Sequence, residues 1–317
     1  MTRFITYGAL AASFAGVIGA TAQQAPVFRG TADVVRVFAT VTDRDGRIVT
    51  TLTRGDFEVR DEGKPQPITQ FDNTPQPIRL IVMLDVSGSM QGNLPLLRAA
   101  GAQLFARLAA EDVARVGSFG NEITISPSFT RDPGELQAAL PRSIPEDAPT
   151  PLWRAIDQAL DAFGKEDDRR PVILVLSDGK DTGPFSFRQR PVSQAEVIDR
   201  SRRENVMIYA VGMRSRPARQ QPPGIGPGGL QAALLADLPD PGLARVAEET
   251  GGGYTEIRFG EDLGAAFSAV VDELHSQYLL GFAPPKRDGK VHDINLRITS
   301  QGGLKPRARK SYVASKE

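Results

Sequence analysis

The chain has 317 residues, of which 40% are hydrophobic and none is cysteine. Its 38 acidic and 38 basic residues balance, so the composition gives no electrostatic reason to expect nucleic acid or an anionic lipid surface as a partner. The length allows one large core and a smaller one. The lack of cysteine excludes disulfide bonds and a lipid anchor on an N-terminal cysteine.

Residues 1–22 have the features of a secretory signal peptide. They carry one positive charge, at Arg3, then a moderately apolar stretch, and they close with the small residues Ala20 and Ala22. We expect cleavage after Ala22 and export to the periplasm or the extracellular space. An uncleaved anchor stays open, because the stretch is close to the minimum length for a membrane span. No later segment is apolar enough to span, so we expect no stable membrane span after cleavage.

The two flanks of the chain, residues 27–76 and 284–317, predict β-structure. Val35, Val37, Ala39 and Val41 alternate with more polar residues, as strands with one buried face do. Residues 292–299 and 307–314 alternate in the same way. Since neither flank supplies enough strands alone, we predict that the two pair into one small antiparallel β domain.

Residues 77–283 predict an α/β domain with a doubly wound, mostly parallel sheet, because strands and helices alternate along them. The expected strands lie near 79–85, 113–119, 122–127, 171–177, 206–212, 253–258 and 277–282. The expected helices lie near 94–110, 133–140, 151–163, 193–204, 240–250 and 261–275.

A segment within this domain, residues 214–230, contains four prolines and four glycines. This composition is incompatible with regular structure, so we expect a mobile excursion from the domain. It is either a tolerated surface insertion or a partner-binding loop on the face where the parallel strands end.

The strand at 79–85 runs directly into a turn that carries Asp85, Ser87 and Ser89. One carboxylate and two hydroxyls are oxygen ligands of the kind that Mg²⁺ prefers, and Gly88 allows the turn to be tight. The same residue types are also common in an ordinary tight turn, so the turn alone does not decide between the two interpretations.

Two later segments favour the metal site. Thr150 is expected to cap the helix at 151–163, with Pro151 in the first turn, and Asp178 directly follows the strand at 171–177. Sites in open α/β sheets form beyond the carboxyl ends of the parallel strands, where Asp85 and Asp178 should both lie.

These residues, Asp85-Val-Ser-Gly-Ser89, Thr150 and Ser177-Asp178-Gly179, resemble the metal-ion-dependent adhesion site of von Willebrand factor type A domains. The resemblance covers about Pro77 to Ala283. It implies Asp85, Ser87, Ser89, Thr150 and Asp178 as direct or water-mediated ligands of Mg²⁺, with Mn²⁺ or Ca²⁺ as other possible ions. The flanks, through residues 42–46, 56–59 and 277–281, further resemble the bacterial "VWFA-related domain" proteins common in Acidobacteria.

The favoured hypothesis is a binding module in which a partner protein's Asp or Glu carboxylate binds the ion. A scaffold whose metal site is only structural stays open, and a metal-dependent hydrolase is less favoured. A phosphohydrolase of the haloacid-dehalogenase type would need a second carboxylate two residues after Asp85, and Ser87 stands there. No nucleophile elbow, cysteine nucleophile or phosphate-binding glycine loop is present in the sequence. We therefore expect no enzymatic activity.

Other polar and aromatic residues have simpler interpretations. Trp153 is expected to pack the start of its helix against the sheet. His275 and His292 are expected in surface or core polar roles rather than as metal ligands. Asp147 and Asp181 are expected to be solvated loop acids, unless they support the metal ligands. The basic residues near the C-terminus are expected to protect a sheet edge: Lys305, Arg307, Arg309 and Lys310.

Overall fold

The computed structural model describes residues 34–164, 167–178, 180–183, 190–213, 240–258, 262–300 and 302–316. The predicted signal peptide, residues 1–22, and the Pro/Gly-rich segment, residues 214–230, lie outside the described residues. Within the described part of the chain, no helix combines the length and the apolar character needed to cross a membrane.

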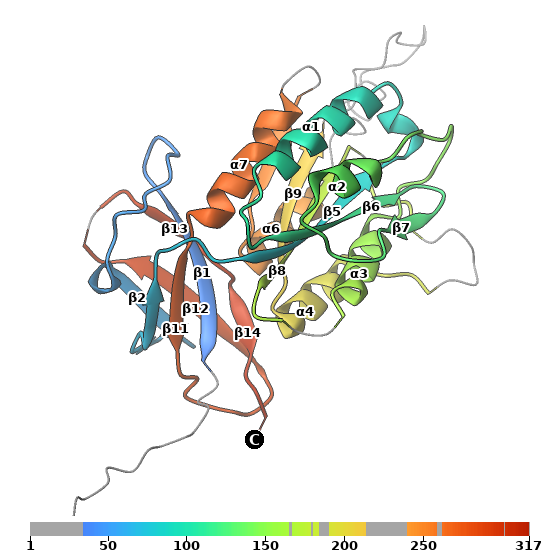
Figure 1. Ribbon diagram of the computed structural model, residues 1–317. Helices are drawn as coiled ribbons and strands as arrows, with labels where there is room; N and C mark the ends of the chain where they lie inside the picture. The colour runs from blue at the N-terminus through green and yellow to red at the C-terminus, as the bar shows by residue number, and fades with distance from the viewer. Residues whose placement is uncertain are drawn as a thin grey trace, which may run out of the picture. The chain divides into compact units, whose positions relative to one another are not determined.

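A six-stranded sheet forms the centre of the larger half (Figure 1), in the order β10-β9-β8-β5-β6-β7. Its strands are β5 (Ile78–Asp85), β6 (Val113–Phe119), β7 (Ile123–Ile125), β8 (Arg170–Ser177), β9 (Met207–Met213) and β10 (Tyr254–Ile257). All neighbouring pairs are parallel except β6 and β7. Every residue of β5 is buried, which explains why it reads as a continuous apolar run.

Helices cover both faces of this sheet. One face packs against α1 (Leu94–Ala106), α2 (Pro133–Ala138) and α7 (Leu263–His275). The other packs against α3 (Leu152–Ala162), α4 (Gln194–Glu204) and α6 (Pro241–Thr250). Alternate residues of β5 belong to the hydrophobic cores on the two faces of the sheet. Leu80 and Val82 lie in the core beneath α1, α2 and α7, and Ile81 and Met83 lie in the core beneath α3, α4 and α6. The predicted doubly wound sheet is confirmed.

The smaller half is a β sandwich built from both flanks of the chain. One sheet has the order β13-β1-β11-β4 and the other β14-β12-β2-β3. The strands are β1 (Val35–Thr42), β2 (Phe57–Asp61), β3 (Lys64–Gln66), β4 (Gln70–Asp72), β11 (Tyr278–Phe282), β12 (Val291–Ile298), β13 (Lys305–Arg307) and β14 (Ser311–Val313). Val41 pairs opposite Pro306, and Val59 pairs opposite Leu296. The predicted antiparallel pairing of the N- and C-terminal flanks is therefore confirmed.

Strand β11 differs from the sequence-based expectation, which placed residues 277–282 in the central sheet. It pairs antiparallel with β1 and β4 instead. The physical reason is that all five residues of β11 are buried, so their apolar run is equally compatible with a parallel or an antiparallel sheet. Tyr278 fixes the placement, since its hydroxyl accepts from Leu52 N–H and donates to Val49 O within the sandwich.

Polar side chains join α7 to the sandwich. Oε1 of Glu273 accepts hydrogen bonds from Thr40 Oγ1, at 2.9 Å, and from Tyr209 and Arg307. Gln277, just after the helix, donates to Thr40 Oγ1 at 2.8 Å. Thr40 belongs to β1 and Arg307 to β13, so one carboxylate connects a helix of the central domain with two strands of the sandwich.

Candidate metal-binding site

Asp85 is the last residue of β5 and is completely buried. Its Oδ1 accepts a 2.8 Å hydrogen bond from the Ser87 N–H, which bends the chain into the single turn η2 (Gly88–Met90). Its Oδ2 accepts a 2.5 Å hydrogen bond from Ser177 Oγ at the end of β8. Both carboxylate oxygens are thus held by groups from the ends of two adjacent parallel strands.

The hydroxyls of two serines lie between the Asp85 carboxylate and a second carboxylate, that of Asp178. Ser87 Oγ lies 3.0 Å from Ser89 Oγ, and Ser89 Oγ donates to Asp178 Oδ1 at 2.8 Å. Asp85, Ser87 and Asp178 are buried, whereas Ser89 is exposed. The structure therefore brings four of the five predicted ligands into one group, named here the serine–aspartate cluster: Asp85, Ser87, Ser89 and Asp178.

Thr150, the fifth predicted ligand, lies in the loop before α3 and is buried. This loop is bonded to both others, because Gly88 N–H donates to Ala148 O at 3.1 Å and Thr182 N–H donates to Thr150 O at 2.9 Å. The predicted cap is wrong by one residue. Pro151 is the N-cap, and its carbonyl accepts the first helical bond, from Ala155 N–H, which leaves Thr150 outside the helix.

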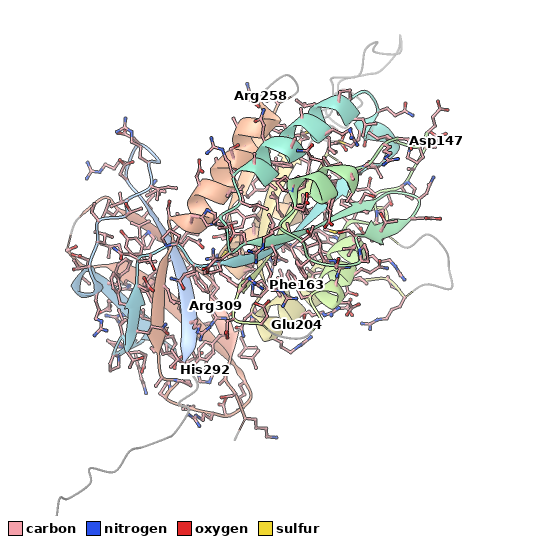
Figure 2. The ribbon with its side chains drawn as sticks, in the orientation of Figure 1. Asp147, Phe163, Glu204, Arg258, His292 and Arg309 are labelled. Atoms are coloured by element: carbon pink, nitrogen blue, oxygen red, sulfur yellow. The ribbon has the colours of Figure 1, made fainter. Side chains whose placement is uncertain are left out.

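Gly88 allows two of these loops to approach closely. A Cβ atom built at Gly88 would lie 3.0 Å from Asp147 N and 3.3 Å from Asp147 Cα. Asp147 itself has a φ of 55°, in the left-handed region that few residues other than glycine adopt. Asp147 lies beyond the end of the sheet at which the cluster forms, as Figure 2 shows. It is exposed, which agrees with the expected solvated loop acid.

The electrostatics of the cluster favour a bound cation. Burial and, to a smaller extent, the nearby Asp178 together raise the pKa of Asp85 to about 7, although hydrogen bonds from Ser177 and Ser87 oppose the shift. Two buried carboxylates in proximity are costly unless a positive charge neutralises them. Among the described residues, no group of three or more His, Cys, Asp or Glu side chains is arranged to hold a metal. The donors that remain are two carboxylates and hydroxyls, which suit a hard cation that keeps some of its water.

Ser177 is a participant that the sequence analysis missed. The β5–β8 register pairs Leu84 with Leu176, so the next positions, Asp85 and Ser177, lie at the same level of the sheet. The sequence did contain a signal, because aligning the ends of the two predicted strands would have brought Ser177 beside Asp85.

Two residues near the cluster stabilise the start of α3. Asp181 accepts hydrogen bonds from Trp153 N–H at 3.3 Å and Gly183 N–H at 3.1 Å, and burial raises its pKa. Trp153 is only 6% exposed and packs in the core on that face of the sheet, as expected. A Cβ at Gly242 of α6 would lie 2.7 Å from the Trp153 ring. Asp181 therefore positions a helix rather than acting as a free loop charge.

Neither histidine is bonded to the serine–aspartate cluster. His275 Nε2 lies 2.8 Å from Asp112 Oδ2. His292 is 4% exposed and lies between Asp61, at 3.1 Å, and Asp288, at 3.2 Å. Both are structural polar residues, in agreement with the expectation.

The fold and the cluster together define an α/β domain with oxygen ligands at the carboxyl edge of its sheet. The sequence profile of the von Willebrand factor type A domain matches residues 80–180. The chain therefore contains a von Willebrand factor type A domain. Among curated proteins, none matches the sequence.

Solved structures with a similar fold have low sequence identity. The von Willebrand factor type A protein from Catenulispora acidiphila is 12% identical, with 92% of this chain and 76% of that chain covered and a TM-score of 0.48. BatB from Bacteroides thetaiotaomicron is 15% identical, with 62% and 98% covered and a TM-score of 0.45. Proximal thread matrix protein 1 from the mussel byssus, described as having a zinc-occupied MIDAS motif, is 18% identical, with 68% and 49% covered and a TM-score of 0.43.

Proposed function

We propose that this protein is a metal-dependent protein-binding module. The domain binds one divalent cation through Asp85, Ser87, Ser89, Thr150 and Asp178, and a partner protein binds that cation through an Asp or Glu carboxylate. The observation that supports this proposal is the buried pair of carboxylates, Asp85 and Asp178, linked by two serine hydroxyls where adjacent parallel strands end.

The residues of the cluster would have separate tasks. Asp85 and Asp178 supply the negative charge that holds the cation, and the Ser177 hydroxyl fixes the orientation of the Asp85 carboxylate. Gly88 keeps the loops before α3 and after β5 in contact. All of these donors are oxygen atoms, which favours Mg²⁺, with Mn²⁺ or Ca²⁺ as alternatives.

The partner would approach through the side of the cluster that is open to solvent. Ser89 is exposed while the carboxylates beneath it are buried, so a partner's carboxylate can come close without displacing the protein's own acids. A charge-assisted bond in such a partly desolvated place can anchor an otherwise ordinary interface.

Binding is favoured over catalysis because the position two residues after Asp85 holds Ser87, so a second carboxylate for acid–base chemistry is missing there. Export to the periplasm or the extracellular space is part of the proposal and rests on the sequence of residues 1–22. A scaffold with a purely structural ion is the alternative that the experiments below separate.

Calorimetric titration of the metal-free protein with Mg²⁺, Mn²⁺, Ca²⁺ and Zn²⁺ tests the site. We expect binding that Asp85→Asn abolishes, with Asp272→Asn, an exposed acid on α7, as the control. No binding of any of the four ions would overturn the site assignment.

A pull-down from an envelope extract tests the function. We expect a partner that is recovered with the ion and lost with EDTA or Asp85→Asn. If chelation lowers the melting temperature but the recovered proteins do not change, the ion is structural and the binding function is wrong.

A further inference from the structure

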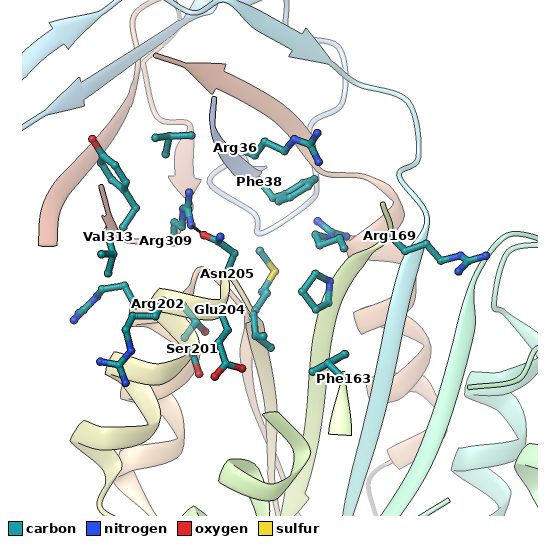
Figure 3. A pocket seen from close by; sticks show the side chains of 18 of the residues that line it. Arg36, Phe38, Phe163, Arg169, Ser201, Arg202, Glu204, Asn205, Arg309 and Val313 are labelled. Carbon is teal, nitrogen blue, oxygen red and sulfur yellow. Dashed lines mark hydrogen bonds between the residues drawn. The ribbon is translucent and has the colours of Figure 1, made fainter. Parts of the chain in front are cut away.

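A second candidate site lies at the opposite edge of the central sheet from the serine–aspartate cluster. A cavity of about 820 Å³ opens between the amino ends of the parallel strands and the β sandwich. Arg170 begins β8 and Met207 begins β9, and both line it; Ser311 of β14 lines it from the sandwich. Figure 3 shows Arg309 and Asn205 on one side of this cavity, with Phe38 and Phe163 toward the other.

Three polar atoms of lining residues are buried without a hydrogen-bond partner among the described residues. They are Arg170 Nε, Arg309 Nε and Ser311 Oγ. Arg170 is 5% exposed and Ser311 is 3% exposed, so water at the outer surface does not reach these groups easily. A buried donor without a partner destabilises a protein, which points to a ligand that accepts hydrogen bonds here.

The charge of the lining also favours an anion. Seven arginines and four acidic residues line the cavity. One of the acids, Asp168, is exposed. The other three already form ion pairs with arginines: Asp167 with Arg169, Glu204 with Arg200, and Glu249 with Arg202. Four of the arginines have no such pair within the described part of the chain: Arg36, Arg170, Arg203 and Arg309.

Arg309 is the arginine best placed to bind a ligand. It donates one hydrogen bond, from Nη1 to Asn205 Oδ1, a neutral acceptor. Burial lowers the pKa of Arg309 to about 10, and the structure offers it no ion pair among the described residues to offset this. Arg170 differs, because its two terminal nitrogens already donate to Gln277 and to Leu274 O.

We propose that this cavity binds a small organic anion. Its carboxylate or phosphate group accepts hydrogen bonds from Arg309 and Ser311, and its apolar part packs against Phe38 and Val313 of the lining. Such a ligand gives the half-buried Arg309 a countercharge and satisfies two of the three unpartnered groups, Arg309 Nε and Ser311 Oγ. The site is independent of the divalent cation, since its residues belong to the other edge of the sheet.

Calorimetry on the full chain in EDTA, with inorganic phosphate, hexyl phosphate and hexanoate as probes, tests this site. We expect hexyl phosphate or hexanoate to bind more tightly than inorganic phosphate, because only they fill the apolar part. Comparing the two also shows whether the head group is a phosphate or a carboxylate. No binding of any of these probes would overturn the proposal.

Variants then locate the binding. We expect Arg309→Gln to weaken binding at least about tenfold, equal to about 1.4 kcal/mol, through loss of a charge-assisted bond. Ser311→Ala should weaken it about threefold, and this smaller change keeps the test valid if Arg309→Gln does not fold. The control is Lys310→Gln, which removes the same charge from the next residue, outside the cavity lining. Equal losses in Arg309→Gln and Lys310→Gln would show nonspecific charge attraction and refute the site.

Discussion

Ser177 Oγ donates a 2.5 Å hydrogen bond to Oδ2 of Asp85, across the two central strands of the larger sheet. The bond lowers the pKa of Asp85, against the opposing effects of burial and of Asp178. The hydroxyl therefore favours the ionised form of the carboxylate that the proposed site needs, and it does so from a position that need not touch the cation.

Ser177→Ala should weaken divalent-cation binding by about tenfold. The expected cause is the loss of a hydrogen bond to a charged acceptor, worth about 1.5–3 kcal/mol, part of which water can replace. Calorimetric titration with Mg²⁺ or Mn²⁺ measures the change. Ser118→Ala is the matched control, since Ser118 in the adjacent strand β6 bonds only to Thr124 among the contacts described. Unchanged affinity in Ser177→Ala would mean that Asp85 is oriented by other groups.

Asp178→Asn should stabilise the metal-free protein while abolishing cation binding. The substitution removes one of two buried like charges, and a gain of about 1 kcal/mol in the free energy of unfolding is expected at neutral pH. Urea denaturation in EDTA, with and without the substitution, measures this gain. The result would be contradicted by a variant that is less stable than the parent without metal yet still responds to added Mg²⁺.

Gly88→Val should disrupt the proposed site through the backbone. Since even a Cβ here would lie 3.0 Å from Asp147 N, the larger side chain must push the loop before α3 away from the loop after β5. We expect a cost of about 1–3 kcal/mol in stability and loss of cation binding. Gly302→Val is the control, because a Cβ at Gly302 meets nothing within 4 Å. Thermal denaturation and calorimetry together check both effects.

Glu273→Gln should destabilise the protein far more than Asp272→Asn, its neighbour on α7. Glu273 accepts bonds from Thr40, Tyr209 and Arg307 in a largely buried place, and breaking such a network costs about 3 kcal/mol. Asp272 pairs with Arg107, both about half exposed, so its loss should cost about 0–1 kcal/mol. Chemical denaturation of both variants checks the difference, and equal costs would show that the network contributes little.

Asp112→Asn should reduce the loss of stability in acid. Burial would raise the pKa of Asp112, but hydrogen bonds from His275 and from the Ile78 and Ala109 amides outweigh it and lower the pKa below 3.8. The unfolded chain therefore takes up this proton first, so the stabilisation is present above pH 3.8 and is lost as the pH falls through the lowered value. Plots of the free energy of unfolding against pH, measured between about pH 2 and pH 5, should be flatter for the variant, and parallel plots would contradict the assignment.

The sequence predicted the fold correctly where a hydrophobic pattern was compatible with only one structural arrangement. Asp85 and Asp178 were placed at strand ends because buried parallel strands read as continuous apolar runs. The same continuous apolar pattern caused β11 to be assigned to the wrong sheet. When every residue of a strand is buried, its sequence does not indicate which strand it pairs with. The cap at Thr150 was misplaced because Pro151 has a non-helical ψ of 63° and is therefore the N-cap itself. Ser177 was missed because its role depends on register between two strands, which spacing along one chain does not display.

The pairing of the two flanks has a consequence for biosynthesis. Strand β1 pairs with β11 and β13, and β2 pairs with β12 on one side and with the adjacent β3 on the other. All partners of β1 and one partner of β2 are therefore translated more than 200 residues later. Contacts this distant in sequence form slowly. The central domain can complete its own sheet first, and the sandwich closes afterwards, so the chain carries unpaired, apolar strand edges during synthesis and depends on the last strands to cover them.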